Sequence, residues 1–134
     1  MTNLTEIAVE RMKDDRGFVF SNNYKIIKVE ENYCEMEGVI DSTSYNPFGI
    51  IHGGYIFGLA DTAGGIASMT NLRTALTINS SIEYLRSSKS DKIIAKATAI
   101  KTGKNICVVE VPIFDCKDEM IAKATITYFY IDKQ

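Results

Sequence analysis

The sequence predicts an α+β domain in which one curved antiparallel sheet of about six strands wraps around a single long central helix. Three observations predict this class. Six segments rich in β-forming residues are joined mostly by short polar connections, which favour antiparallel neighbours. One apolar stretch between them lacks proline and is too long for a strand. The length of 134 residues suits one core, so we expect a single domain over residues 1–134, with a short helical N-terminal extension over residues 1–17.

The first elements are a short helix and a hairpin. Residues 3–14 place four apolar side chains at helical spacing, with Asn3 available as the N-cap and Glu6 three residues later. Two β-rich segments, 24–30 and 33–41, are separated only by a polar dipeptide, which predicts a hairpin.

Four further strands are predicted after the central helix, over residues 75–85, 92–101, 105–115 and 120–131. Pro112 has no N–H to donate to a ladder, so we expect it at a sheet edge or a bulge. One helix against six strands leaves sheet edges and a face uncovered, which favours association with a second copy.

Composition excludes several classes of protein. A hydrophobic content of 46% with 24% charged residues is typical of a folded soluble protein, and a net charge of −2 argues against nucleic-acid binding. Three cysteines and one histidine without metal-type spacing predict neither a disulfide framework nor a metal site. Because no stretch approaches the length of a membrane span and no leader is evident, we expect a cytoplasmic protein without membrane contact.

The central helix, predicted from Gly53 to about Leu72, has an apolar stripe and an opposite side where several glycines surround Asp61. Interior glycines cost about 1 kcal/mol each relative to alanine, so something must compensate. They either allow another element to pack closely or leave room for a ligand beside the Asp61 carboxylate.

The residues before this helix combine turn chemistry, from Asn46 to Gly49, with the sequence His52-Gly53-Gly54 at the helix start. The first backbone N–H groups of a helix are unpaired and carry partial positive charge, and two glycines let a ligand approach them. Such a site binds an anion or the oxyanion of acyl transfer. The known phosphate-binding glycine motifs are absent, which disfavours a phosphate cradle.

These residues resemble the hotdog-fold acyl-CoA thioesterases, in the branch typified by the phenylacetic-acid-degradation thioesterase of the 4-hydroxybenzoyl-CoA thioesterase-like superfamily. The resemblance spans about residues 20–131. It rests on matching residues before and within the helix and in the strand and turn that follow: Asn46, His52-Gly53-Gly54, Phe57, Leu59-Ala60-Asp61, Thr77, Ile82, Tyr84, Leu85 and Gly103-Lys104. The segment 85–88 departs from it, because many relatives carry a proline there.

The resemblance implies hydrolysis of an acyl-CoA thioester and a role for each matching residue. Gly53 would donate its N–H to the thioester oxygen, while His52 and Asn46 shape that pocket. Asp61 would act as general base or nucleophile, and Thr77 would orient the water. Coenzyme A is part of the substrate, and no cofactor or metal is expected.

Geometry adds an expectation of a dimer. Gly53 and Asp61 are eight residues apart, or about 12 Å along a helix, too far to act on one carbonyl. If two copies pack their helices antiparallel, Asp61 of one copy meets Gly53 of the other. We therefore predict a homodimer with shared sites, and a dimer of dimers is a plausible further assembly.

Residues expected to bind substrate are Gly54, Tyr84, Arg86, Gly103 and Lys104. The basic residues would contact the phosphates of coenzyme A, with Lys104 the best candidate, although each is also explained as an ordinary solvated charge. Tyr84, with Tyr55, Phe57 and Met69, either lines an acyl pocket or belongs to the core. Two other functions stay open at this point: an acyl-CoA-binding hotdog module without catalysis, and a dehydratase or isomerase acting on acyl thioesters.

Overall fold

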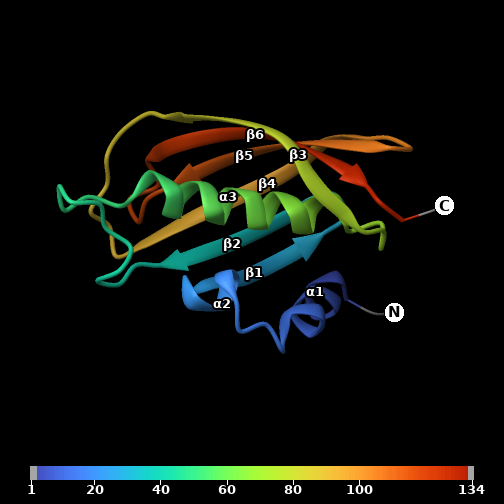
Figure 1. The fold of residues 1–134 in the computed structure, drawn as a ribbon, viewed down its shortest axis with the longest axis horizontal. Coiled ribbons are helices and arrows are strands. Elements are labelled where there is room, and N and C mark those ends of the chain that lie inside the picture. Colours follow the sequence, from blue (N-terminus) through green and yellow to red (C-terminus); the bar gives the residue numbers. More distant parts are fainter. Residues whose placement is uncertain (1–2, 133–134) are drawn as a thin grey trace.

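The computed structural model describes residues 3–132, which form one curved sheet around a helix (Figure 1). The helices are α1 (Leu4–Met12), α2 (Phe18–Ser21) and α3 (Gly53–Ser68). The strands are β1 (Tyr24–Glu30), β2 (Tyr33–Val39), β3 (Ala75–Tyr84), β4 (Lys92–Thr102), β5 (Ile106–Phe114) and β6 (Met120–Tyr130).

All six strands belong to one antiparallel sheet in the order β1-β2-β4-β5-β6-β3. Helix α3 lies in the concave face of this sheet, with β1 and β3 at the two edges (Figure 1). The predicted α+β class and its hotdog arrangement are confirmed.

The core lies between α3 and the concave face of the sheet. The predicted apolar stripe of the helix is buried there, including Ile56, Leu59 and Ala63. Alternate residues of β5 and β6 face the helix, such as Val109 and Ile126, which are fully buried. The apolar side chains that recur every 3.6 residues in the helix and every two residues in the strands therefore pack together in one layer.

Most element bounds agree with the sequence within two residues, and two features differ. Helix α3 ends at Ser68, because the chain leaves helical geometry at Met69 and Leu72 has a positive φ of 67°. The short helix α2 was not predicted, since four residues carry no periodic signal. Asn3 does cap α1, where its side chain accepts hydrogen bonds from the N–H groups of Thr5 and Glu6.

Of the two positions expected for Pro112, the sheet edge is excluded because β5 is an interior strand, whereas an irregular ladder beside Pro112 is observed. Pro112 pairs with Lys123 of β6, and a register shift follows directly between Ile113 and Phe114. Interior strands tolerate proline beside such irregularities, where one ladder hydrogen bond is already missing.

Two of the helix glycines are required for close packing. A Cβ at Gly58 would lie 2.5 Å from the Tyr24 hydroxyl and 2.8 Å from the Phe18 ring. A Cβ at Gly64 would lie 2.3 Å from the Tyr128 hydroxyl. Gly58 and Gly64 therefore allow aromatic side chains to pack closely against the helix, which was one of the two roles expected for the helix glycines.

Strand β3 is an edge strand whose side chains are largely exposed. Leu76 and Ile78 are more than half exposed, and of its ten residues only Ala75 is buried. An exposed apolar edge strand is a surface on which another chain can pair. Between residues 3 and 132, no helix is long and apolar enough to cross a membrane.

Candidate active site

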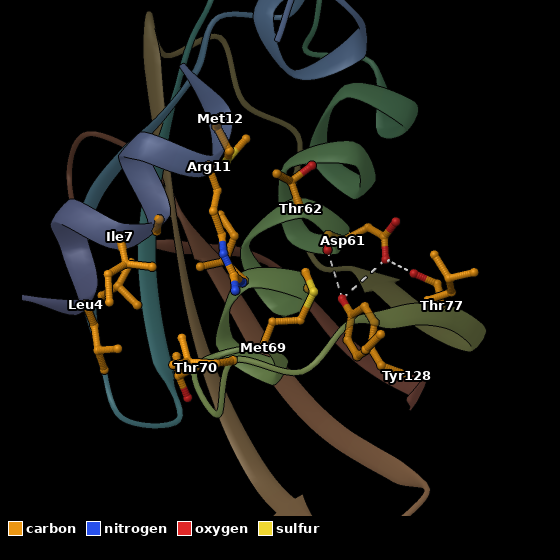
Figure 2. A pocket seen from close by; sticks show the side chains of 17 residues that line it. Leu4, Ile7, Arg11, Met12, Asp61, Thr62, Met69, Thr70, Thr77 and Tyr128 are labelled. Atoms are coloured by element: carbon orange, nitrogen blue, oxygen red, sulfur yellow. Dashed lines mark hydrogen bonds between the residues drawn. The ribbon is translucent and has the colours of Figure 1, made fainter. Parts of the chain in front are cut away.

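Asp61 occupies the middle of α3 and is held by two hydroxyl groups (Figure 2). The Thr77 hydroxyl donates to Asp61 Oδ1 over 2.7 Å. The Tyr128 hydroxyl lies 3.2 Å from the same oxygen and 2.8 Å from the Asp61 backbone oxygen. Thr77 and Tyr128 are directly paired in the β3–β6 ladder, so the sheet register brings both hydroxyls to this carboxylate.

This arrangement leaves one carboxylate oxygen available. Among residues 3–132, Asp61 Oδ1 has two donors and Oδ2 has none. A carboxylate oxygen with free lone pairs accepts a hydrogen bond from water. Burial and the neighbouring Asp61 carboxylate raise the pKa of Tyr128, so this phenol stays protonated and acts as a donor.

The start of α3 presents one unpaired N–H. His52 is the N-cap, and its Nδ1 accepts the N–H of Gly54 over 2.7 Å. The neutral ring therefore carries its proton on Nε2. The N–H of Gly53 has no acceptor in the described part of the chain, whereas that of Gly54 is occupied. Of the two glycines, Gly53 thus has the free donor at the positive end of the helix dipole.

Tyr84 supports this helix start from β3. Its hydroxyl donates to the Gly53 carbonyl over 2.8 Å, and its ring would lie 3.2 Å from a Cβ at position 53. Glycine at this position therefore lets Tyr84 pack against the backbone. Tyr84 contacts the helix start and does not line the large cavity described below, while Tyr55 is buried in the core.

Asn46 stabilises the turn before the helix. Its Oδ1 accepts the N–H groups of Phe48, at 2.9 Å, and Ile50, at 3.3 Å. The side-chain oxygen is thus used locally, and a role for the amide nitrogen in the oxyanion pocket stays a prediction.

The predicted phosphate-binding residues are dispersed in one protomer. Arg86 forms an ion pair with Glu119, so it is already partnered. Gly103 and Lys104 form the β4–β5 turn, at the end of the sheet away from the start of α3 (Figure 1). There the Lys104 carbonyl accepts the guanidinium of Arg73 over 2.7 Å.

A cavity of about 330 Å³ adjoins Asp61. Its walls come from α1, the second half of α3, the beginning of β3 and Tyr128, and Figure 2 shows Asp61 and Thr77 on the side opposite to α1. Sequence reasoning missed the roles of Tyr128 and α1. The alternation in β6 places Tyr128 on the inward face with Ile126, but nothing local indicates that this face meets Asp61.

The comparisons with known proteins agree with this geometry. The family model of the thioesterase superfamily matches residues 48–122, which include the start of α3, Asp61 and Thr77. The chain belongs to the thioesterase superfamily. A superfamily relative by sequence is a protein of Archaeoglobus fulgidus described as a candidate esterase, 28% identical over 93% of this chain and 84% of its own.

Solved structures extend the superfamily comparison. The E. coli PaaI protein of the phenylacetic acid degradation operon shares the fold, with a TM-score of 0.90, 20% identity and coverage of 98% of this chain and 96% of its own. A hypothetical thioesterase of Streptococcus pneumoniae, solved with coenzyme A, is 30% identical with a TM-score of 0.79, over 84% of this chain and 91% of its own. Variants of the pneumococcal protein were also solved with one aspartate or one threonine replaced by alanine, at positions sixteen residues apart.

Proposed function

We propose that this protein hydrolyses acyl-CoA thioesters to a free acid and coenzyme A, with Asp61 activating the attacking water. The observation that carries the proposal is the pairing of two features on α3. Asp61 is fixed through one carboxylate oxygen while the other is free, and the first N–H of the same helix is unpaired. A general base and an oxyanion donor are what thioester hydrolysis requires.

The comparisons support the same reading. The pneumococcal relative was solved with coenzyme A. The aspartate and threonine replaced in its variants have the separation of Asp61 and Thr77 in this chain, sixteen residues. The contact between Asp61 and Thr77 gives this spacing a structural reason, because the threonine orients the carboxylate.

The proposed reaction proceeds by water attack. Asp61 Oδ2 accepts a proton as the water oxygen bonds to the thioester carbon, and the carbonyl electrons move onto oxygen. The Gly53 N–H and the helix dipole stabilise this oxyanion. When the intermediate collapses, the C–S bond breaks and the coenzyme A thiolate leaves with the proton returned from Asp61.

The proposed site is shared between two protomers. Asp61 and Gly53 lie on one continuous helix, about 12 Å apart along its axis, so neither can reach the carbonyl that the other contacts. The exposed edge of β3 provides a surface for two-fold pairing that sets the helices side by side and antiparallel. A homodimer with two equivalent sites is the proposed functional unit, and a dimer of dimers is its proposed further assembly.

Coenzyme A is proposed to extend from this interface toward basic side chains. Lys104 is the preferred phosphate contact. The β4–β5 turn, which contains Lys104, lies at the end of the sheet remote from Gly53 of the same protomer, and antiparallel pairing would bring this end toward Gly53 of the other protomer. Arg86 would first have to leave Glu119.

The test is a thiol-release assay over acyl-CoA thioesters with wild type and Asp61→Asn. We expect hydrolysis by wild type and a loss of about 100-fold or more in kcat for Asp61→Asn, the scale of a lost general base. Asp118→Asn is the matched control, because Asp118 has a positive φ of 62° in the exposed β5–β6 turn, a conformation that asparagine tolerates. Full turnover by Asp61→Asn would refute the mechanism.

A further inference from the structure

The cavity beside Asp61 has a polar end and an apolar body. The polar end is formed by Asp61, Thr62, Thr77 and Tyr128. Beyond it the walls are almost entirely apolar and include Ile7 of α1. A thioester whose carbonyl carbon is attacked near Asp61 would therefore place a hydrophobic group in this body.

We propose that this cavity binds the acyl group of the substrate, that α1 forms its far wall, and that Gly65 determines the length of chain it accepts. This inference rests on the proposed function. It assigns the substrate class as acyl groups with an apolar chain, because the walls beyond the polar end are mostly apolar, and the cavity of about 330 Å³ limits the length of that chain.

The space beside Gly65 is the feature that indicates a ligand. It lines the cavity, and a Cβ added there would lie 3.7 Å from Tyr128 Cε1 and 4.0 Å from Met69 Cε, which are ordinary contacts. The adjacent Gly64 has no such room, since its Cβ would lie 2.3 Å from a hydroxyl. Interior glycine weakens a helix relative to alanine, so packing alone does not account for glycine at position 65. The missing methyl leaves space in the cavity.

Helix α1 is attached firmly enough to serve as a wall. The Thr5 hydroxyl donates to the Val29 carbonyl over 3.1 Å and accepts the Val29 N–H over 2.8 Å, which joins the helix to edge strand β1. Ala8 packs into the core from the same helix. Arg11 is an exposed residue of α1 that also lines the cavity, and Figure 2 shows its guanidinium extending from α1 toward Met69. In Figure 2 the labelled α1 residues face Met69 across the cavity.

The experiment alters the cavity from its two walls and measures the chain-length profile of hydrolysis from acetyl-CoA to palmitoyl-CoA. For wild type, kcat/KM should rise by up to about fourfold per methylene until the cavity is full. Gly65→Ala should lower kcat/KM for decanoyl-CoA about tenfold more than for acetyl-CoA, and Ile7→Ala should move the optimum to longer chains. Val9→Ala is the control, because Val9 is exposed on α1 and does not line this cavity.

A binding measurement separates this inference from the proposed function. Calorimetric titration with S-alkyl-CoA thioethers, which cannot be hydrolysed, should rank the chain lengths by affinity in the same order as kcat/KM. Gly65→Ala should shift the tightest binding to shorter chains, and Ile7→Ala should shift it to longer chains. Binding with these shifts but no hydrolysis of any thioester would support the acyl cavity and refute the proposed function. Hydrolysis with a chain-length profile unchanged in both Gly65→Ala and Ile7→Ala would overturn the cavity assignment.

Discussion

At the scale of single residues, the Asp61 carboxylate is held in one orientation while one of its oxygens stays available for a hydrogen bond. One carboxylate oxygen is held by Thr77 and Tyr128, so the side chain has a defined orientation without the other oxygen being used. As the proposed base, a carboxylate held in this way would lose little orientational freedom when the water arrives. Tyr128 contributes as a neutral donor, since its pKa is raised by burial and by Asp61 itself.

Replacing Thr77 by valine tests this orienting role. Thr77→Val keeps the shape of the side chain and removes the donor to Asp61 Oδ1. Because Tyr128 still donates to the same oxygen, we expect kcat to fall by about tenfold, the equivalent of one hydrogen bond to a charged group, with little change in KM. Steady-state kinetics would measure it, and Thr77→Ser should restore most of the turnover. An unchanged kcat in Thr77→Val would show that the hydroxyl does not act through Asp61.

Helix α3 serves three purposes at the scale of secondary structure. Its apolar stripe fills the core, its first N–H has no acceptor among residues 3–132, and its second half borders the cavity. The glycines divide between these purposes. Gly64 allows Tyr128 to reach the Asp61 backbone, whereas Gly65 leaves space that no protein atom fills.

The two adjacent glycines predict opposite effects on stability. Gly64→Ala must displace the Tyr128 hydroxyl, so the free energy of unfolding should fall by about 1–3 kcal/mol, as in other overpacked cores. Gly65→Ala meets only ordinary contacts and should raise it by up to about 1 kcal/mol through helix propensity. Urea denaturation of both variants measures the difference. A Gly64→Ala protein as stable as Gly65→Ala would contradict the packing described for Tyr128.

At the scale of the whole molecule, the proposed mechanism divides the site into two halves. In that mechanism one end of α3 supplies the oxyanion donor without a base, and its middle supplies the base without an oxyanion donor. The exposed β3 edge lies beside the same face of the molecule, with Tyr84 contacting the start of the helix and Thr77 contacting its middle. Association of two copies through this face would complete both sites.

Mixing two inactive variants tests the shared site. Asp61→Asn and Gly53→Pro should each be inactive alone, since proline removes the N–H at a helix position where its backbone geometry is tolerated. After dissociation and random reassociation, half of the dimers are mixed and each has one intact site, so about a quarter of wild-type activity should return. Thiol release after mixing measures the recovery, and native mass spectrometry confirms the mixed dimers.

The matched control is Gly53→Ala, which meets the same Tyr84 ring but keeps the N–H. It should retain far more activity than Gly53→Pro. If mixed dimers form and no activity returns, each site lies within one protomer.

Much of this fold followed from the sequence because its signals are local. Hydrophobic periodicity and polar connections predict the strand segments and α3. The observed bounds agree with these predictions within two residues except at the end of α3. For Pro112 the edge and the bulge both stayed open, because a missing N–H indicates an irregular ladder but not where its strand stands in the sheet. Asp61, Gly53 and Thr77 were recognised by family resemblance, and their contacts were not predictable from spacing alone.

The sequence by itself determined the fold class and the central helix, since turn chemistry and hydrophobic periodicity act between near neighbours, and its resemblance to a family indicated the candidate base and oxyanion donor. Only the tertiary structure decided the strand order and the pairing of Thr77 with Tyr128 around Asp61. It also decided that α1 borders the cavity and that Gly64 and Gly65 differ. Such contacts join residues up to 67 positions apart, and they depend on the register of a packed sheet, which no local pattern specifies.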